Sequence, residues 1–189
     1  MKCLLCGDYT FFHICKNCQE LFLAPSIYKR KVLDVDVISF YKYDEIKDFL
    51  HTKHTDLGYY IFNILAKNSF FRFAKEFEYN EIIASIAVDD RIKENYSHTA
   101  ILNSHLKSKY ITPKFKKLIA TNDISYSGKS KEYRLTHPRN FTCKSFKEGS
   151  LILVDDIITT GATLTQAITT LKKYDKEVLF CLTLADARK

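Results

Sequence analysis

The chain has 189 residues, a net charge of +7, 46% hydrophobic residues and 14% aromatic residues, which suits one ordinary domain with a small appendage. Its apolar runs are shorter than the roughly 18 residues that a membrane-spanning helix requires. The start, MKCLLCGDYT, lacks the apolar region of a signal peptide. The composition therefore predicts a cytoplasmic protein and argues against a membrane-spanning one.

The first 24 residues contain two Cys-x-x-Cys pairs, Cys3 with Cys6 and Cys15 with Cys18. Each pair can place two thiolates on one metal ion, and two pairs complete a tetrahedral site. In the cytoplasm a metal is favoured over disulfides. Residues 1–24 are therefore predicted to be a zinc-binding module with a structural Zn²⁺. His13 is an alternative ligand, although four cysteines already fill the site.

The apolar side chains of this module are expected to pack around the metal or against the main domain: Phe11, Phe12, Leu21, Phe22 and Leu23. Residues 25–31 follow as a predicted linker, because Pro25 precedes a polar, basic stretch.

Residues 32–189 alternate predicted strands and helices, which indicates an α/β domain with a parallel sheet and right-handed crossovers. The expected strands are one or two within 32–43, then 81–88, 116–121, 151–154 and 177–185. Helices are expected from Asp44, over 59–77, from Thr99 and over 164–171. Residues of about 122–147 show little periodicity and are predicted to be a mobile basic loop.

The predicted helix over 59–77 is rich in aromatic residues. We interpret them as core and dimer surface, and base stacking by a nucleic acid is the alternative. The residues are Tyr60, Phe62, Phe70, Phe71, Phe73 and Phe77.

The stretch from Leu151 to Leu171 carries most of the functional information. Its four apolar residues 151–154 are typical of a strand covered on both faces, and Asp155 and Asp156 follow directly. A turn of small and hydroxylated residues comes next, before a helical repeat of apolar residues: Thr159, Thr160, Gly161, Ala162 and Thr163.

A helix amino terminus beyond the carboxyl end of a parallel strand can bind a phosphate. The acidic pair next to it can accept hydrogen bonds from two neighbouring hydroxyls, so the stretch predicts a site for a sugar phosphate. The alternative is a buried strand followed by a helix capped by Thr159 or Thr160. That alternative leaves two adjacent acids at a strand end unexplained.

This stretch resembles the phosphoribosyl pyrophosphate (PRPP) motif of type I phosphoribosyltransferases. The resemblance implies that Asp155 and Asp156 hold the ribose 2- and 3-hydroxyls and that residues 159–163 wrap the 5-phosphate. Together with the cysteine pairs, the motif resembles the ComF family, competence-associated proteins that join a zinc module to a phosphoribosyltransferase domain. The likeness continues at Tyr43, at residues 53–56 and in the carboxyl-terminal LTLADAR.

The middle of the chain departs from this family. Members carry a proline-valine-proline strand end and an RGFNQ segment, whereas this chain has Ala84-Ser85-Ile86 and then residues 95–99, NYSHT. Arg91 falls where the family has an arginine, and residues 130–134, SKEYR, match its flexible-loop serine and arginine loosely. PRPP binding is therefore better supported than turnover.

The resemblance implies displacement of pyrophosphate from ribose C1, assisted by Mg²⁺. Charge stabilisation would come from Arg91 and Arg134, with Lys129 and Lys131 as further cations.

Positive charge is concentrated between His105 and Gly149, where eleven lysines or arginines accompany three acids, an excess of eight positive charges. This excess favours a polyanionic partner. The alternative is a solvated lysine-rich face.

Three functions are consistent with these features. The first is a PRPP-dependent transferase with an unknown acceptor, which by resemblance acts in DNA uptake and natural transformation. The second is a non-catalytic module of the competence machinery that binds single-stranded DNA or senses PRPP. It would work with other competence proteins at the inner face of the membrane. The third is a regulator with PRPP as effector. A homodimer is usual for the implied fold.

Overall fold

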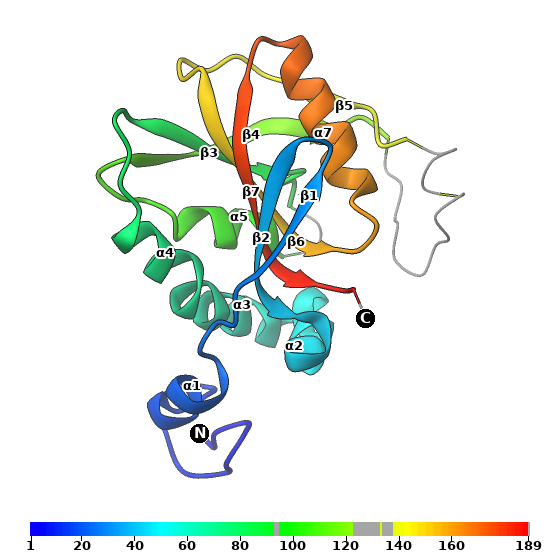
Figure 1. Cartoon of the computed structure of the whole chain (residues 1–189). Coiled ribbons are helices and arrows are strands. Elements are labelled where there is room, and N and C mark those ends of the chain that lie inside the picture. The colour runs from blue at the N-terminus through cyan, green and yellow to red at the C-terminus, as the bar shows by residue number, and fades with distance from the viewer. Residues whose placement is uncertain (93–94, 123–132, 134–137, 189) are drawn as a thin grey trace.

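The computed structural model describes residues 1–92, 95–122, 133 and 138–188. Within them seven strands form one sheet in the order β1-β2-β7-β6-β3-β4-β5 (Figure 1). The five central strands are parallel, and β1 and β5 pair antiparallel at the two edges. The strands are β1 (Tyr28–Val32), β2 (Val35–Lys42), β3 (Ile83–Val88), β4 (Ile111–Ala120), β5 (Phe141–Cys143), β6 (Ser150–Ile158) and β7 (Glu177–Asp186).

Helices cover both faces of the sheet, so the predicted α/β class is confirmed. One face packs against α2 (Tyr43–Leu50), α3 (Asp56–Asn68), α4 (Phe70–Glu76) and α5 (His98–Ser104), whose buried residues share one core. The other face packs against α7 (Ala162–Lys173) in a second core (Figure 1). Among the described residues, no helix has the length and apolar character needed to cross a bilayer.

The central strands form because their sequences are apolar on both faces. All six residues of β3 are buried, and so are residues 151–155 of β6. Such strands are stable only between two layers of helices, and α5 and α7 supply these layers on opposite sides.

Three sequence predictions need correction. The predicted linker 25–31 contributes most of β1, which starts at Tyr28 and pairs with β2. The single helix predicted over 59–77 is two helices, α3 and α4, separated at Ser69. The loop predicted at about 122–147 contains the short strand β5, while its residues 123–132 and 134–137 lie outside the described part of the chain.

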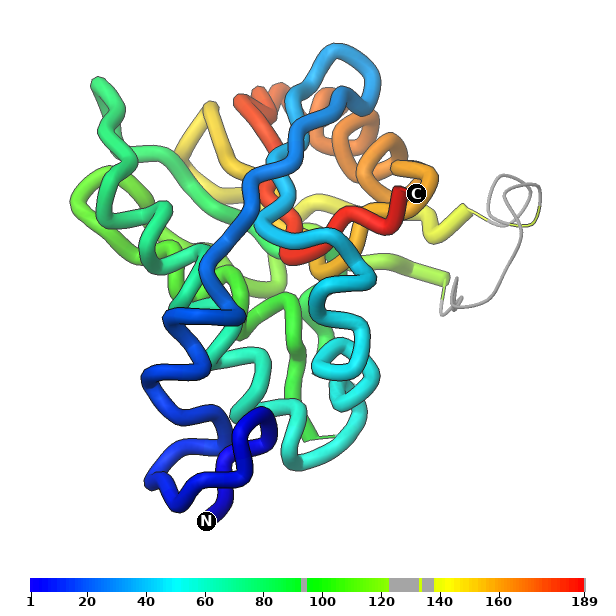
Figure 2. The backbone as a smooth tube through the Cα atoms, turned by 60° about the horizontal axis from the view of Figure 1, so that its bottom comes forward, coloured from blue at the N-terminus to red at the C-terminus, as the bar shows by residue number. Residues whose placement is uncertain are grey.

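The cysteine-rich segment lies at one end of the molecule, next to α3 (Figures 1 and 2). It contains one helix, α1 (Lys16–Phe22), and docks through the fully buried Ile14 and Leu23. The Gln19 Oε1 atom accepts a hydrogen bond of 3.0 Å from Asn68 Nδ2 on α3. The segment therefore shares its core with the sheet domain.

The packing predicted for the five apolar residues of this segment is wrong for all but one of them. Leu23 is buried, but Phe11 is 95% exposed and Phe22 is 64% exposed. Phe12 and Leu21 are exposed as well. The cysteine-rich segment therefore presents an apolar surface to solvent.

Candidate functional site

The candidate site lies where β6 separates from β3 at the carboxyl edge of the sheet. β3 pairs with β6 only as far as Val154, whereas Asp155 and the following residues pair with β7 alone. The helices that follow β3 and β6 lie on opposite faces, which makes this the topological switch point where α/β sheets bind ligands. A pocket of about 440 Å³ opens here, and its lining includes both motif aspartates.

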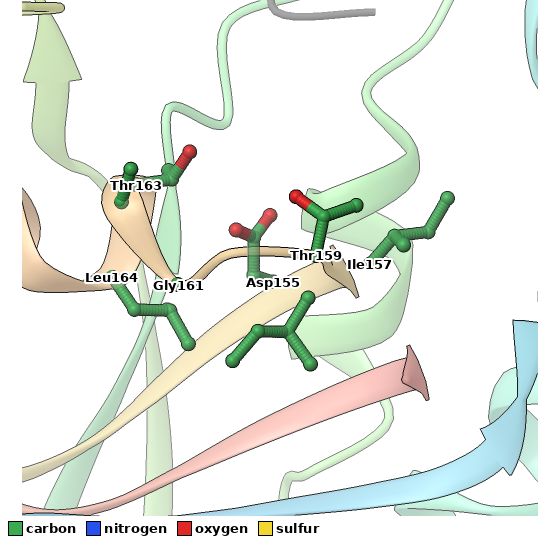
Figure 3. Close-up of a pocket in the computed structure, with 8 residues that line it drawn as sticks. Asp155, Ile157, Thr159, Gly161, Thr163 and Leu164 are labelled. Atoms are coloured by element: carbon green, nitrogen blue, oxygen red, sulfur yellow. The ribbon is translucent and has the colours of Figure 1, made fainter. Parts of the chain in front are cut away.

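The turn after β6 has the form of an anion-binding loop. Gly161 adopts φ +82° and is the N-cap of α7, whose helical residues begin at Ala162. The hydroxyls of Thr159 and Thr163 and the carboxylate of Asp155 point to the same side of this loop, and Leu164 points away from them (Figure 3). The N–H groups at the start of α7 can therefore serve a phosphate on that side. That of Ala162 makes a long hydrogen bond of 3.4 Å to Thr160 Oγ1, which a phosphate would replace.

Gly161 is required at this turn for two reasons. Its backbone lies in the left-handed region that favours glycine. A Cβ atom here would also lie 2.9 Å from Val32 Cγ2 on β1. The edge strand β1, which the sequence did not predict, therefore packs directly against this loop.

Asp155 is buried, and its Oδ1 atom accepts a hydrogen bond of 2.9 Å from the backbone N–H of Asp156. Burial, together with the adjacent Asp156 charge, raises the pKa of Asp155 well above its ordinary value, and Arg139 opposes this shift. A cation bound next to Asp155 would therefore favour the ionised form of this carboxyl group.

The surroundings of Asp156 shift its pKa in the opposite direction. Burial opposes its ionisation, but His98 and Lys53 outweigh that cost and hold the pKa of this carboxyl below its ordinary range. His98 Nε2 lies 3.2 Å and Lys53 Nζ 3.5 Å from Asp156 Oδ2. Asp156 is therefore the ionised member of the pair.

Arg91, predicted as a catalytic cation, does line the pocket. Its Nε and Nη2 atoms donate hydrogen bonds of 2.6 and 3.0 Å to the two carboxylate oxygens of Asp89. The backbone of Asp89 has φ +49°. Arg134, Lys129 and Lys131, the other predicted cations, lie outside the described residues.

The sequence alone did not single out three basic residues of the pocket, Arg139, His98 and Lys53. Arg139 lines the pocket near Asp155, and its backbone N–H donates to Gln166 Oε1 of α7 at 2.8 Å. His98 was read only as part of a segment that departs from the family, and Lys53 only as part of a loose match. Their role depends on contacts across the fold, which a single sequence does not display.

The four cysteines predicted as metal ligands do converge. Their Sγ atoms all lie within 4.8 Å of one another, and the Cys6 and Cys15 sulfurs are 3.8 Å apart. A tetrahedron with Zn–S bonds of about 2.3 Å has S···S edges of roughly 3.8 Å, so the cluster fits Zn²⁺. His13 instead packs its ring against Tyr60, with centroids 4.7 Å apart.

The electrostatics of the cluster also suit a cation. Burial opposes ionisation of Cys3, but the backbone N–H groups of Cys6, Cys15 and Leu5 lower the pKa of this thiol to about 6. Burial and then the neighbouring cysteines raise the pKa of Cys18. A bound dication would remove the mutual repulsion that keeps such thiols protonated.

Comparison with known proteins gives a distant structural likeness. No protein-family model matches the chain, and no curated protein matches it. Seven chains of solved structures match, among them a hypoxanthine phosphoribosyltransferase from Staphylococcus aureus. That enzyme is 14% identical, with a TM-score of 0.39, over 66% of this chain and 62% of the enzyme. The match thus spans less than two thirds of the enzyme's length.

Proposed function

We propose that the protein binds PRPP at the pocket between β3 and β6. One observation supports this most directly. The acidic pair, the loop threonines Thr159 and Thr163 and the cations Lys53, Arg91 and Arg139 all line one pocket at the switch point of the sheet. Gly161 and Ala162 line a small second pocket that shares Asp155, Thr159 and Thr163 with it. PRPP, a ribose with a phosphate at one end and a diphosphate at the other, offers hydroxyls to the acidic pair and phosphates to the loop and the cations.

In this proposal each element has a separate task. The N–H groups at the start of α7 bind the 5-phosphate, and the carboxylates of Asp155 and Asp156 accept hydrogen bonds from the ribose hydroxyls. Arg91 turns from Asp89 to the pyrophosphate. The acidic oxygens are of the type that Mg²⁺ prefers, so Asp155 would hold a Mg²⁺ ion that neutralises the leaving pyrophosphate when bound.

If the protein is a transferase, the bond between C1 and the pyrophosphate oxygen breaks as a bond from C1 to the acceptor forms. The positive charge that develops on the ribose ring would be stabilised by the Asp156 carboxylate. The acceptor is unknown. Membership of the ComF family, and a cytoplasmic role in natural transformation, belong to the same proposal and rest on the sequence resemblance.

Calorimetric titration with PRPP and Mg²⁺ tests the proposal. The wild type should bind, and D155N combined with D156N should lower the affinity at least about tenfold, because the ionised acceptor Asp156 and the Asp155 carboxyl group that would hold Mg²⁺ are both lost. D34N combined with D36N is the matched control, since it removes the same charge where β2 begins, at the amino edge of the sheet. Equal affinity of both double variants would disprove the proposed site.

A second candidate function, binding of single-stranded DNA, is favoured by the exposed aromatic rings. Tyr59 and Tyr60 on α3 are 48% and 52% exposed. The Tyr60 ring contacts His13 of the cysteine-rich segment, and the Tyr59 ring contacts Tyr96 at the pocket, with centroids 5.9 Å apart. This aromatic row offers stacking surfaces between the metal site and the pocket.

Fluorescence anisotropy of a labelled oligonucleotide tests this second function. Binding should weaken steeply as salt increases, because phosphate contacts release counterions. Tyr60→Ala should weaken it about fivefold or more, as expected for loss of one stacking ring. Tyr174→Ala is the control, since Tyr174 is similarly exposed at the end of α7. A flat salt response would exclude this function.

A further inference from the structure

Contacts on both carboxylate oxygens of Asp156 restrict the rotation of this group. Oδ2 contacts both Lys53 Nζ and His98 Nε2, and Oδ1 accepts a hydrogen bond of 2.8 Å from the backbone N–H of Ile157. A carboxylate offers about four acceptor positions. These three contacts leave about one position for a ligand, and they fix the plane of the carboxylate.

Both of these side chains, Lys53 and His98, are themselves held in place. The Tyr96 hydroxyl donates a hydrogen bond of 2.6 Å to the backbone carbonyl of Lys53, which lies in the short 3₁₀ helix η1 (His51–His54). Tyr96 can approach because Gly58 lies below it, where a Cβ atom would clash with the phenol oxygen. The orientation of Lys53 is therefore set from two other segments of the chain.

His98 is held by helix α5 and by an aromatic neighbour. It is the first residue of α5, and the Oγ atom of the N-cap Ser97 accepts a hydrogen bond from the Ala100 N–H. Its ring packs against Phe62 of α3 with centroids 5.5 Å apart. The side chains of His98 and Lys53 are 23% and 27% exposed, so both remain next to the pocket.

We infer that Lys53 and His98 are positioning residues that make the pocket selective for ribose 5-phosphates over 2-deoxyribose 5-phosphates. By fixing the one open acceptor position of Asp156, they direct it at the ribose 2-hydroxyl, the group that 2-deoxyribose lacks. Without them the carboxylate can rotate, and the bond to that hydroxyl weakens. The loop of residues 159–163 holds the phosphate independently of this arrangement. This inference rests on the proposed function.

The test compares binding of ribose 5-phosphate and 2-deoxyribose 5-phosphate by calorimetry. The wild type should prefer ribose 5-phosphate by about tenfold, the value expected for one hydrogen bond to a charged acceptor. His98→Ala should reduce this preference to about twofold by weakening ribose 5-phosphate alone. Lys53→Met also removes a positive charge from the pocket, so it should weaken both sugar phosphates but ribose 5-phosphate more, again reducing the preference to about twofold. His98→Gln, which keeps an N–H donor, should recover part of it.

His105→Ala is the matched control. His105 is the C-cap residue of the same helix, and its Nε2 atom contacts Asn63 rather than the pocket. This variant should keep the full preference for ribose. A variant that merely loosened the fold would instead weaken both sugars equally.

Two results would overturn the inference while leaving PRPP binding intact. One is a wild type that binds PRPP but does not distinguish the two sugars, an outcome that does not depend on whether any variant folds. The other is an unchanged preference in His98→Ala and Lys53→Met. Loss of PRPP binding by the wild type itself would instead remove the proposed function.

Discussion

At the scale of single residues, the two motif aspartates have opposite effects on stability. Asp155 has a raised pKa, so its charge destabilises the folded chain, whereas Asp156 has a lowered pKa because His98 and Lys53 surround it. Binding sites often retain such an unfavourable charge because the ligand needs it. Substitution of each aspartate in turn should therefore change the stability of the protein in opposite directions.

Asp155→Asn should stabilise the protein. A raised pKa means that the group stabilises the fold most below its ordinary pKa of about 4 and that this contribution is lost as the pH rises through the folded-state value. The free energy of unfolding of the variant should therefore exceed that of the wild type by about 1–2 kcal/mol at pH 8. The gain should vanish near pH 4. Urea unfolding at several pH values measures it, and a loss of stability at pH 8 would contradict this assignment.

Asp156→Asn should do the reverse. A lowered pKa means that the carboxylate stabilises the fold above its ordinary pKa and that this contribution fades as the pH falls below about 4. Removing the charge leaves Lys53 and His98 without their partner, which should cost about 1–3 kcal/mol at pH 7. The same unfolding series checks it, and equal effects of the two substitutions would argue against distinct environments.

Gly161→Ala tests the proposed role of the loop of residues 159–163. The left-handed backbone and the close approach of Val32 both oppose a side chain at this position. The substitution should destabilise the protein by about 1–3 kcal/mol and abolish PRPP binding. Gly149→Ala is the control, because a Cβ atom there would meet nothing within 4 Å. Normal PRPP affinity in Gly161→Ala would show that the loop does not hold the ligand.

At the scale of elements, the sequence predicted the parts whose patterns are local. β3, β6, α7 and β7 were found because apolar runs and helical spacing are visible within a few residues. β1 was missed because its three central residues, 29–31, are all basic, so its sequence shows no apolar alternation, and pairing with β2 decides its conformation. The break at Ser69 was missed because no glycine or proline marks it and apolar residues resume directly after it at Phe70.

The residues of the candidate site also divide into those with a local sequence pattern and those that only the fold brings together. The motif residues 155–163 are contiguous, and their placement at one pocket could be predicted. Lys53, His98 and Arg139 come from three other segments, and only the fold brings them to the acidic pair. The four cysteines are not contiguous either, but the spacing of their two pairs identifies them.

At the scale of the whole molecule, the cysteine-rich segment is part of the main core. Cys3, Ile14, Cys18 and Leu23 belong to the same buried cluster as Leu65 and Phe70 of α3 and α4. The Tyr41 hydroxyl on β2 donates a hydrogen bond of 2.8 Å to the Leu23 carbonyl. A metal held by this segment should therefore stabilise the entire chain.

Removal of the metal should accordingly lower the stability of the whole protein. Because metal binding is coupled to folding, treatment with a chelator should lower the melting temperature by about 5 °C or more in a single transition. Cys3→Ser should have the same effect without a chelator. Differential scanning calorimetry measures both. A main transition at an unchanged temperature would show that the segment is an independent appendage.

The central claim, that one pocket grips a phosphorylated ribose, is tested most directly by a crystal structure with PRPP and Mg²⁺. The account predicts the 5-phosphate on the backbone N–H groups at the start of α7 and the ribose hydroxyls on Asp155 and Asp156, with Lys53 and His98 still on Asp156. A sugar bound elsewhere, or a loop of residues 159–163 filled by side chains, would contradict it.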